Sequence, residues 1–234
     1  MCSQRTHAHS HEARGEAFSC VEESVTIDGP SGELEGLTLC PADGARADAI
    51  GVICHPHPLY GGTMHNKVVH YLAKTLNELG LCTVRFNFRG VGASEGSYGD
   101  GDGEVQDLQA VLDWVRQRQR QAGADIWLAG FSFGAYVALR EGCAEGVSRL
   151  ITVAPPVNLF DFEVFEPPSC PWLLLQGESD EVVPYRNVRR WVGRLNRPPE
   201  FVPLPGVDHF FHGKLNVLHE VLMDRLASSV QRSA

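Results

Sequence analysis

The chain has 234 residues, of which 43% are hydrophobic, and its formal net charge is −9. This length and composition favour a single globular domain, and an acidic balance without a basic run argues against nucleic acid or an anionic membrane surface as a partner. No apolar segment is long enough to cross a bilayer. We therefore expect a chain without nucleic-acid or membrane partners that acts as a monomer or homodimer.

The N-terminal segment 1–18 is polar, contains His7, His9 and His11, and has no apolar signal-peptide core. We interpret it as a disordered tail, with loose metal chelation as the alternative, ahead of one domain that spans 19–234. Seven cysteines form no C-x-x-C pair, and several occupy apolar segments. This usage favours reduced cysteines and a cytoplasmic location.

Two strands are predicted first, at 21–27 and 33–41, joined by the turn DGPSG. Strand-like apolar runs then alternate with helical patterns. The further predicted strands are 49–54, 82–88, 125–130, 149–154, 171–176 and 200–205, and the predicted helices are 66–80, 104–123, 134–142, 185–195 and 214–230. This order predicts an α/β fold with a mostly parallel, twisted sheet of about eight strands and helices on both faces.

The pattern Gly-x-Ser-x-Gly occurs twice, as GFSFG around Ser132 and as GASEG around Ser94. It is typical of a sharp strand-to-helix turn that exposes a nucleophilic serine. Ser132 follows the apolar run DIWLAG and precedes the helical segment GAYVALREG, whereas Ser94 precedes a loop rich in glycine and aspartate. Ser132 is therefore the candidate nucleophile, and Ser94 is interpreted as a loop residue.

Two further candidates, Asp180 and His209, also follow predicted strands. Chemistry collects at the carboxyl ends of the strands in such sheets. A serine hydroxyl needs a base to take its proton, histidine titrates near neutrality, and a carboxylate orients the imidazole. The competing candidates are the acids Glu178, Glu181 and Asp161 and the histidine His212.

The loop HPHPLYGGTMHNK, residues 55–67, follows a predicted strand. An oxyanion needs backbone N–H donors, and we expect one from Phe133 and one from this loop. Proline has no N–H, which leaves His57, the favoured donor, and Leu59. The loop histidines allow a metal interpretation, but neither an H-E-x-x-H helix nor a carboxylate cluster is present, and the segment RGVGASEG does not fit a dinucleotide site. We expect no metal and no cofactor.

These segments, with FNFRGVGASEG, GESDEVVP and DHFFHGKL, resemble the α/β-hydrolase superfamily over residues 20–230. The likeness is to a small lidless serine-hydrolase group with an HPHP-x-x-GGTM-x-NK loop, similar in size to dienelactone-hydrolase-like enzymes. The resemblance implies Ser132 as nucleophile, Asp180 as acid, His209 as base, and the N–H groups of His57 and Phe133 as oxyanion donors. Dienelactone hydrolases carry a cysteine nucleophile, so a serine here favours ordinary ester chemistry.

Many α/β hydrolases insert a helical lid after the strand that ends here near Ala154, but this chain has only PPVNLFDFEVFEPPSC before the next strand. An open site favours small soluble acyl substrates, so the resemblance predicts a serine hydrolase that cleaves carboxylic esters or thioesters through an acyl-enzyme. The alternatives are a short-peptide or amide hydrolase and an inactive binding protein with the same fold. The candidates for the substrate pocket are Leu59, Tyr60, Phe160, Phe162 and Phe165, of which the three phenylalanines could equally pack under the loop.

Overall fold

The computed structural model describes residues 22–41, 49–119, 125–162 and 167–230, and the predicted tail lies outside them. The strands are β1 (Glu23–Gly29), β2 (Gly32–Leu39), β3 (Ala49–Cys54), β4 (Cys82–Phe86), β5 (Asp125–Phe131), β6 (Val147–Val153), β7 (Trp172–Gly177) and β8 (Glu200–Leu204). The helices are α1 (Lys67–Glu78), α2 (Asp102–Gln119), α3 (Phe133–Arg140), α4 (Tyr185–Val192) and α5 (Leu215–Leu226), with 3₁₀ turns η1 (Pro58–Tyr60) and η2 (Ala227–Ser229). Within these residues, no helix combines the length and apolar character needed to cross a membrane.

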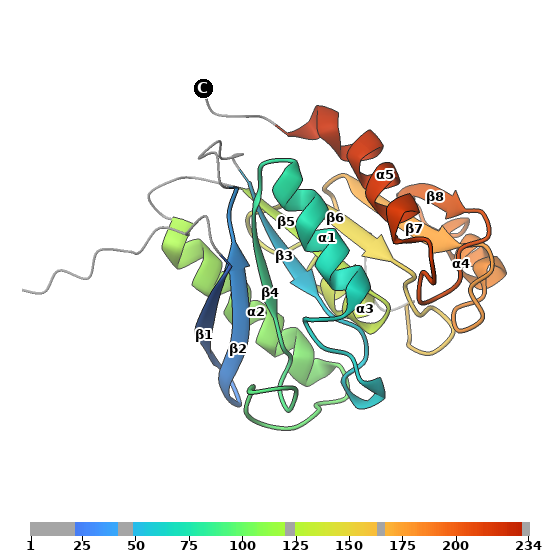
Figure 1. Ribbon diagram of the computed structural model, residues 1–234. Helices are drawn as coiled ribbons and strands as arrows, with labels where there is room; N and C mark the ends of the chain where they lie inside the picture. The colour runs from blue at the N-terminus through green and yellow to red at the C-terminus, as the bar shows by residue number, and fades with distance from the viewer. Residues whose placement is uncertain (1–21, 42–48, 120–124, 163–166, 231–234) are drawn as a thin grey trace, which may run out of the picture.

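The strands of the described residues form one eight-stranded sheet in the order β1-β2-β4-β3-β5-β6-β7-β8. Strand β2 runs antiparallel to both of its neighbours, and every other neighbouring pair is parallel. Helices α1 and α5 lie together on the near face of the sheet in Figure 1, and α2 lies behind it. The predicted fold class, a mostly parallel sheet of about eight strands covered on both faces, is confirmed.

The central strands are the continuous apolar runs that a parallel sheet covered on both faces requires. Every residue of β3 and of β7 is buried. Helix α1 packs through Val69, Leu72 and Leu76, whose spacing of three and four places them on one face. This helix begins where the side chain of Asn66 accepts a hydrogen bond from the Val68 N–H at 2.9 Å.

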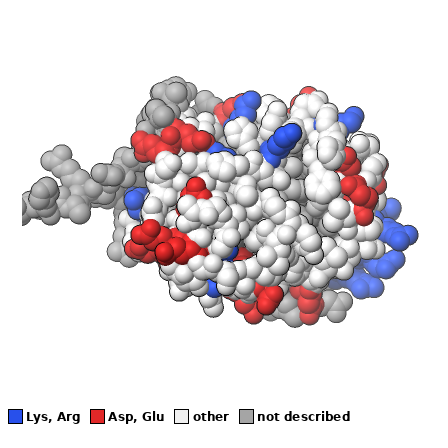
Figure 2. Space-filling view, turned by 60° about the horizontal axis from the view of Figure 1, so that its bottom comes forward, with Lys and Arg blue, Asp and Glu red and all other residues white. Residues whose placement is uncertain are grey.

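The order of the strands reverses at β3, and this reversal opens a crevice. The chain passes from β3 to β4 on one side and later returns to β5 on the other side. The loops that follow β3 and β5 therefore diverge at the carboxyl ends of the strands, which is where open α/β sheets bind ligands. These loops lie in the lower half of Figure 1, and Figure 2 turns this edge toward the viewer. Uncharged side chains fill the middle of that face, and charged side chains lie mostly around its margin.

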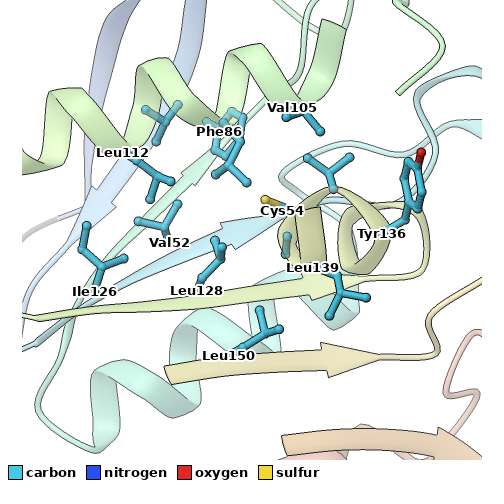
Figure 3. Close-up of a cluster of buried hydrophobic side chains, with 14 of the residues drawn as sticks. Val52, Cys54, Phe86, Val105, Leu112, Ile126, Leu128, Tyr136, Leu139 and Leu150 are labelled. Carbon is cyan, nitrogen blue, oxygen red and sulfur yellow. The ribbon is translucent and has the colours of Figure 1, made fainter. Parts of the chain in front are cut away.

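Two apolar clusters hold the layers together. One cluster joins the sheet to α2, α3 and α4, and the other joins it to α1 and α5. Figure 3 shows Val52 and Phe86 of the sheet facing Val105 and Leu112 of α2, all of them at most 6% exposed. Burial on both faces makes the strand ends rigid supports for the loops that follow them.

Cys40 and Cys82 form a disulfide between the end of β2 and the start of β4. The antiparallel register pairs Leu39 with Thr83, so the next residues, Cys40 and Cys82, face each other with Cα atoms 4.1 Å apart. The expectation of reduced cysteines is therefore wrong for this pair, because strand pairing joins residues that are 42 positions apart in the sequence. Cysteines 54, 143 and 170 are free.

Candidate active site

Ser132 lies at the turn between β5 and α3, as the sequence predicted. Its N–H donates to the carbonyl oxygen of Val153 at 2.8 Å, and its own carbonyl oxygen accepts from the Ala135 N–H at 2.8 Å. Its backbone has φ 53° and ψ −119°. A positive φ is costly for a residue with a Cβ, and it persists where the surrounding structure holds it, which is common at functional sites. The strand and helix together present the hydroxyl at the edge of the sheet.

His209 follows β8 and lies beside Ser132. Its Nε2 is 3.2 Å from the Ser132 Oγ, and its Nδ1 is 2.8 Å from the Asp180 Oδ2. His209 is 4% exposed, and its ring contacts those of Phe131 and Phe210, whose centroids are each 5.2 Å from it. The carboxylate partner requires a proton on Nδ1, so a neutral ring presents the lone pair of Nε2 to the serine hydroxyl.

Asp180 is buried in the loop after β7, and N–H groups satisfy its carboxylate. Its Oδ1 accepts from the backbone N–H groups of Val182 at 3.0 Å and Val183 at 2.6 Å. Its Oδ2 accepts from His209 and from the Gln176 amide at 3.0 Å. These four donors hold the carboxylate in one position, so it can orient the imidazole.

Gln176 was not among the predicted site residues. This buried side chain near the end of β7 donates from Nε2 to Asp180 and, at 2.9 Å, to the carbonyl oxygen of Val183. It thus connects the loop that contains Asp180 to strand β7. The available signal was a lone polar residue at the end of the apolar run PWLLLQ, because buried polar groups require partners.

The competing candidates lie apart from this arrangement. Glu178, Glu181 and Asp161 are exposed, whereas Asp180 is 6% exposed and bonded to His209. His212 is exposed and bonds through its ring to Asp208 at 2.9 Å. Of the acids and histidines that the sequence left open, Asp180 and His209 are the pair that the fold brings to Ser132.

The two expected oxyanion donors border the same cavity as the serine. Phe133 is the first residue of α3, and His57 lies in the loop after β3. Neither backbone N–H donates a hydrogen bond to another described residue. Both N–H groups therefore lack an acceptor in the described part of the chain, whereas Leu59, the other candidate, donates its N–H to the His57 ring at 3.2 Å.

His55 holds the loop after β3 in place, a role that was not among the predictions. The buried ring donates from Nδ1 to the Pro56 carbonyl oxygen at 2.6 Å and accepts from the Phe88 N–H on Nε2 at 3.0 Å. Burial lowers its pKa to about 4, so the ring is neutral at neutral pH, as both bonds require. His55 therefore joins this loop to the segment that follows β4.

Tyr98 supports the ring of His57 and was also missed. The His57 Nδ1 accepts from the Leu59 N–H, so the proton of the neutral ring lies on Nε2, which donates to the Tyr98 hydroxyl at 3.2 Å. Burial lowers the pKa of His57, which keeps this ring neutral. Burial likewise raises the pKa of Tyr98 to about 12, so its hydroxyl keeps its proton. An aromatic residue in the glycine-rich segment GSYGDG was the available signal.

A cavity of about 400 Å³ opens beside Ser132 and His209. Of the predicted pocket residues, Tyr60 and Phe160 line it. Leu59, which is 67% exposed, does not line it, and neither does Phe162, which is buried with its ring against those of Tyr136 and Trp191. Phe165 lies outside the described residues. The other lining residues are Pro56, His57, Gly61, Gly62, Asn66, Phe131, Phe133, Pro156, Leu159, Val182 and Phe210.

The histidines of the 55–67 loop do not gather around a metal position. Among the described residues, no group of three or more His, Cys, Asp or Glu side chains could hold a metal ion. The ring nitrogens of His55 and His57 bond instead to backbone groups and to Tyr98.

Comparison with known proteins identifies the family of the chain. The family model described as serine aminopeptidase, S33, matches residues 45–168. An uncharacterized protein of Rickettsia prowazekii is 36% identical over 211 residues, which cover 86% of this chain and 87% of that protein.

Two solved structures are similar over nearly the whole chain. An α/β serine hydrolase homologue from Coxiella burnetii is 50% identical with a TM-score of 0.85, and the match covers 90% of this chain and all of that one. A serine hydrolase without a lid from Xanthomonas campestris is 42% identical with a TM-score of 0.87, and the match covers 94% of this chain and all of that one. The chain therefore belongs to the serine aminopeptidase S33 family and has the fold of a lidless α/β hydrolase.

Proposed function

We propose that the protein is a serine hydrolase that cleaves carboxylic esters or thioesters through an acyl-enzyme, with Ser132, His209 and Asp180 as its catalytic triad. One observation carries this proposal: the unbroken chain of contacts from Ser132 Oγ to His209 Nε2, at 3.2 Å, and from His209 Nδ1 to Asp180 Oδ2, at 2.8 Å. Such a chain has the order of roles that acyl transfer requires.

In the proposed mechanism His209 takes the proton of Ser132 as the hydroxyl attacks the carbonyl carbon. Asp180 stabilises the imidazolium that forms. The N–H groups of His57 and Phe133 bind the oxyanion, since both border the cavity without an acceptor among the described residues. His209 then returns its proton to the leaving alcohol or thiol, and water releases the acyl group by the same steps.

The cavity favours an uncharged, apolar acyl group. Its walls are mainly aromatic and aliphatic, and burial keeps the His57 ring neutral. A volume of about 400 Å³ lies near the lower end of the range for small-molecule sites, which suits a short or medium acyl chain or an aromatic acyl group.

Peptide hydrolysis is the second candidate, and the name of the matched family favours it. An aminopeptidase binds the α-ammonium group of its substrate, for which a carboxylate is the natural partner. No Asp or Glu among the described residues lines the cavity. The geometry therefore supports esters over peptides with a free N-terminus.

The test is labelling by a fluorophosphonate probe, read by intact mass, on the native protein and the variants Ser132→Ala and Ser94→Ala. We expect one adduct on the native protein and on Ser94→Ala, and none on Ser132→Ala. A folded native protein that takes no adduct would contradict the proposal and favour a binding protein without turnover. Rates on 4-nitrophenyl esters and aminoacyl arylamides then separate esterase from peptidase activity.

A further inference from the structure

A second cavity of about 600 Å³ adjoins the first. The two share three lining residues, Asn66, Phe131 and Phe210, so these side chains form the boundary between them. The residues that line the second cavity alone are Thr63, His65, Lys67, Val68, Phe211, His212, Gly213 and Leu215. The proposed triad uses none of these residues.

The boundary between the two cavities lies next to His209, the group that would protonate a leaving group. The boundary residues Phe131 and Phe210 both contact the His209 ring, with centroids 5.2 Å from it. His209 must protonate the leaving group, so that group leaves from the His209 side, whereas the acyl oxygen stays near the N–H groups of His57 and Phe133. A substrate whose acyl half fills the first cavity can therefore extend past Phe210 into the second.

The side chains of the second cavity differ in charge from those of the first. Lys67 lines it and forms no ion pair with a described carboxylate. His65 and His212 also line it, and the acid that bonds to His212, Asp208, is outside the lining. No described Asp or Glu lines this cavity, although the chain carries a net charge of −9. An unpaired lysine and two imidazoles favour an anionic ligand over a cationic one.

We propose that the second cavity binds the leaving-group half of the substrate, and that this half carries an anionic oxygen group, a carboxylate or a phosphate, recognised by Lys67. This inference rests on the proposed function, because a leaving group exists only if the triad transfers an acyl group. It assigns the two halves of the substrate opposite characters: an apolar acyl group and a charged alcohol or thiol.

The experiment compares three esters that share a butanoyl group: 4-nitrophenyl butanoate, a ring-carboxylated counterpart and a ring-phosphorylated counterpart. The measured quantity is the kcat/KM of each anionic ester divided by that of the neutral ester, since this ratio cancels changes in the shared acyl step. The variants are Lys67→Met and Lys67→Glu. Lys74→Met is the matched control, because Lys74 lies two turns along α1 and is 52% exposed, 3.7 Å from Glu78.

We expect Lys67→Met to lower the ratio about fivefold and Lys67→Glu to lower it further, because a solvent-accessible charge pair contributes modestly and charge reversal adds repulsion. High salt should reduce the native ratio toward that of Lys67→Met. The anionic ester with the larger loss identifies the preferred group, carboxylate or phosphate. Lys74→Met should leave both ratios unchanged.

The outcomes separate this inference from the proposed function. Turnover of the neutral ester with ratios that do not depend on Lys67, or that fall equally in Lys74→Met, overturns the leaving-group assignment and leaves the hydrolase intact. Failure to turn over any of the three esters, together with an unlabelled Ser132, contradicts both the leaving-group assignment and the proposed function.

Discussion

The two Gly-x-Ser-x-Gly segments have the same pattern and opposite environments. Ser132 has a positive φ, and its hydroxyl faces His209 at 3.2 Å. Ser94 is also buried, but its hydroxyl donates to the Asn87 carbonyl oxygen at 2.7 Å and accepts from the Glu35 N–H at 2.9 Å. The Ser132 hydroxyl lies beside the His209 imidazole and an open cavity, whereas backbone groups form hydrogen bonds with the Ser94 hydroxyl.

The glycines of the two segments also differ in what they permit. In the first segment, a Cβ at Gly134 would lie 2.6 Å from the His55 carbonyl oxygen, so glycine is required for close packing of α3 on β3. In the second segment, Gly92 and Gly96 have φ values of 59° and 84°, so glycine is required for the turn itself. One pattern thus forms a strand-to-helix turn in one place and a loop anchor in the other.

Removing the hydroxyl of Ser132 should give the largest difference in activity between variants of the two serines. We expect Ser132→Ala to lose at least about three decades in kcat, because the proposed nucleophile is gone, while thermal stability stays near that of the native protein. Ester hydrolysis and a melting curve measure the two quantities. Ser94→Ala serves as the control and should keep its kcat; similar losses in both variants would contradict the distinction between the serines.

Adding a Cβ at Gly134, where the backbone of Cys54 and His55 is close, should have the next largest effect, and the effect is on stability. Gly134→Ala forces α3 away from the Cys54–His55 backbone, and we expect a loss of about 3 kcal/mol in unfolding free energy, as for overpacking in a core. Urea denaturation measures this quantity. Gly193→Ala is the control, since Gly193 has φ −67° and its nearest backbone contact is an ordinary 3.5 Å. Equal stability of the two variants would show that α3 tolerates the shift.

The backbone of His55 packs against Gly134 of the first segment, and its ring should make stability depend on pH. Its folded pKa of about 4 is below the ordinary 6.5, so the unfolded chain binds more protons between these values. The contribution is complete above pH 6.5 and is lost as the pH falls toward 4, which amounts to about 2 kcal/mol between pH 7 and pH 5. Urea denaturation at pH 7 and pH 5 should show that the unfolding free energy of His55→Gln changes less with pH than that of the native protein.

The matched control for this pH dependence is His65→Gln, because His65 is an exposed histidine of the same loop. This variant should keep the native pH dependence. A His55→Gln protein with the native dependence would show that other groups cause it.

Ser94→Ala should have the smallest effect, and on stability alone. The change leaves the Glu35 N–H and the Asn87 carbonyl oxygen without their side-chain partner, which should cost about 1.5 kcal/mol of unfolding free energy. Urea denaturation tests this value. A stability unchanged from the native protein would indicate that water replaces the hydroxyl.

Much of the fold and the candidate site follows from local signals. Continuous apolar runs predicted the buried strands, and stripes of three- and four-residue spacing predicted α1 and α2. In a parallel sheet, the loops that follow the strands lie at the same edge. Ser132, Asp180 and His209 follow β5, β7 and β8, so they could be grouped before any distance was known. Gln176 and Tyr98 could not be grouped with them in this way, because the role of each depends on which loops come together in the folded protein.

The sequence by itself predicted the order of strands and helices along the chain, the strand-to-helix turn at Ser132 and the lidless form of the fold, because periodicity and chain connectivity are local properties. The tertiary structure decided which of three neighbouring acids reaches His209, that Cys40 pairs with Cys82, that Phe162 points into the core, and that a second cavity with Lys67 adjoins the first. These outcomes depend on register and loop packing between residues far apart in the chain, and no pattern within a short window carries that information.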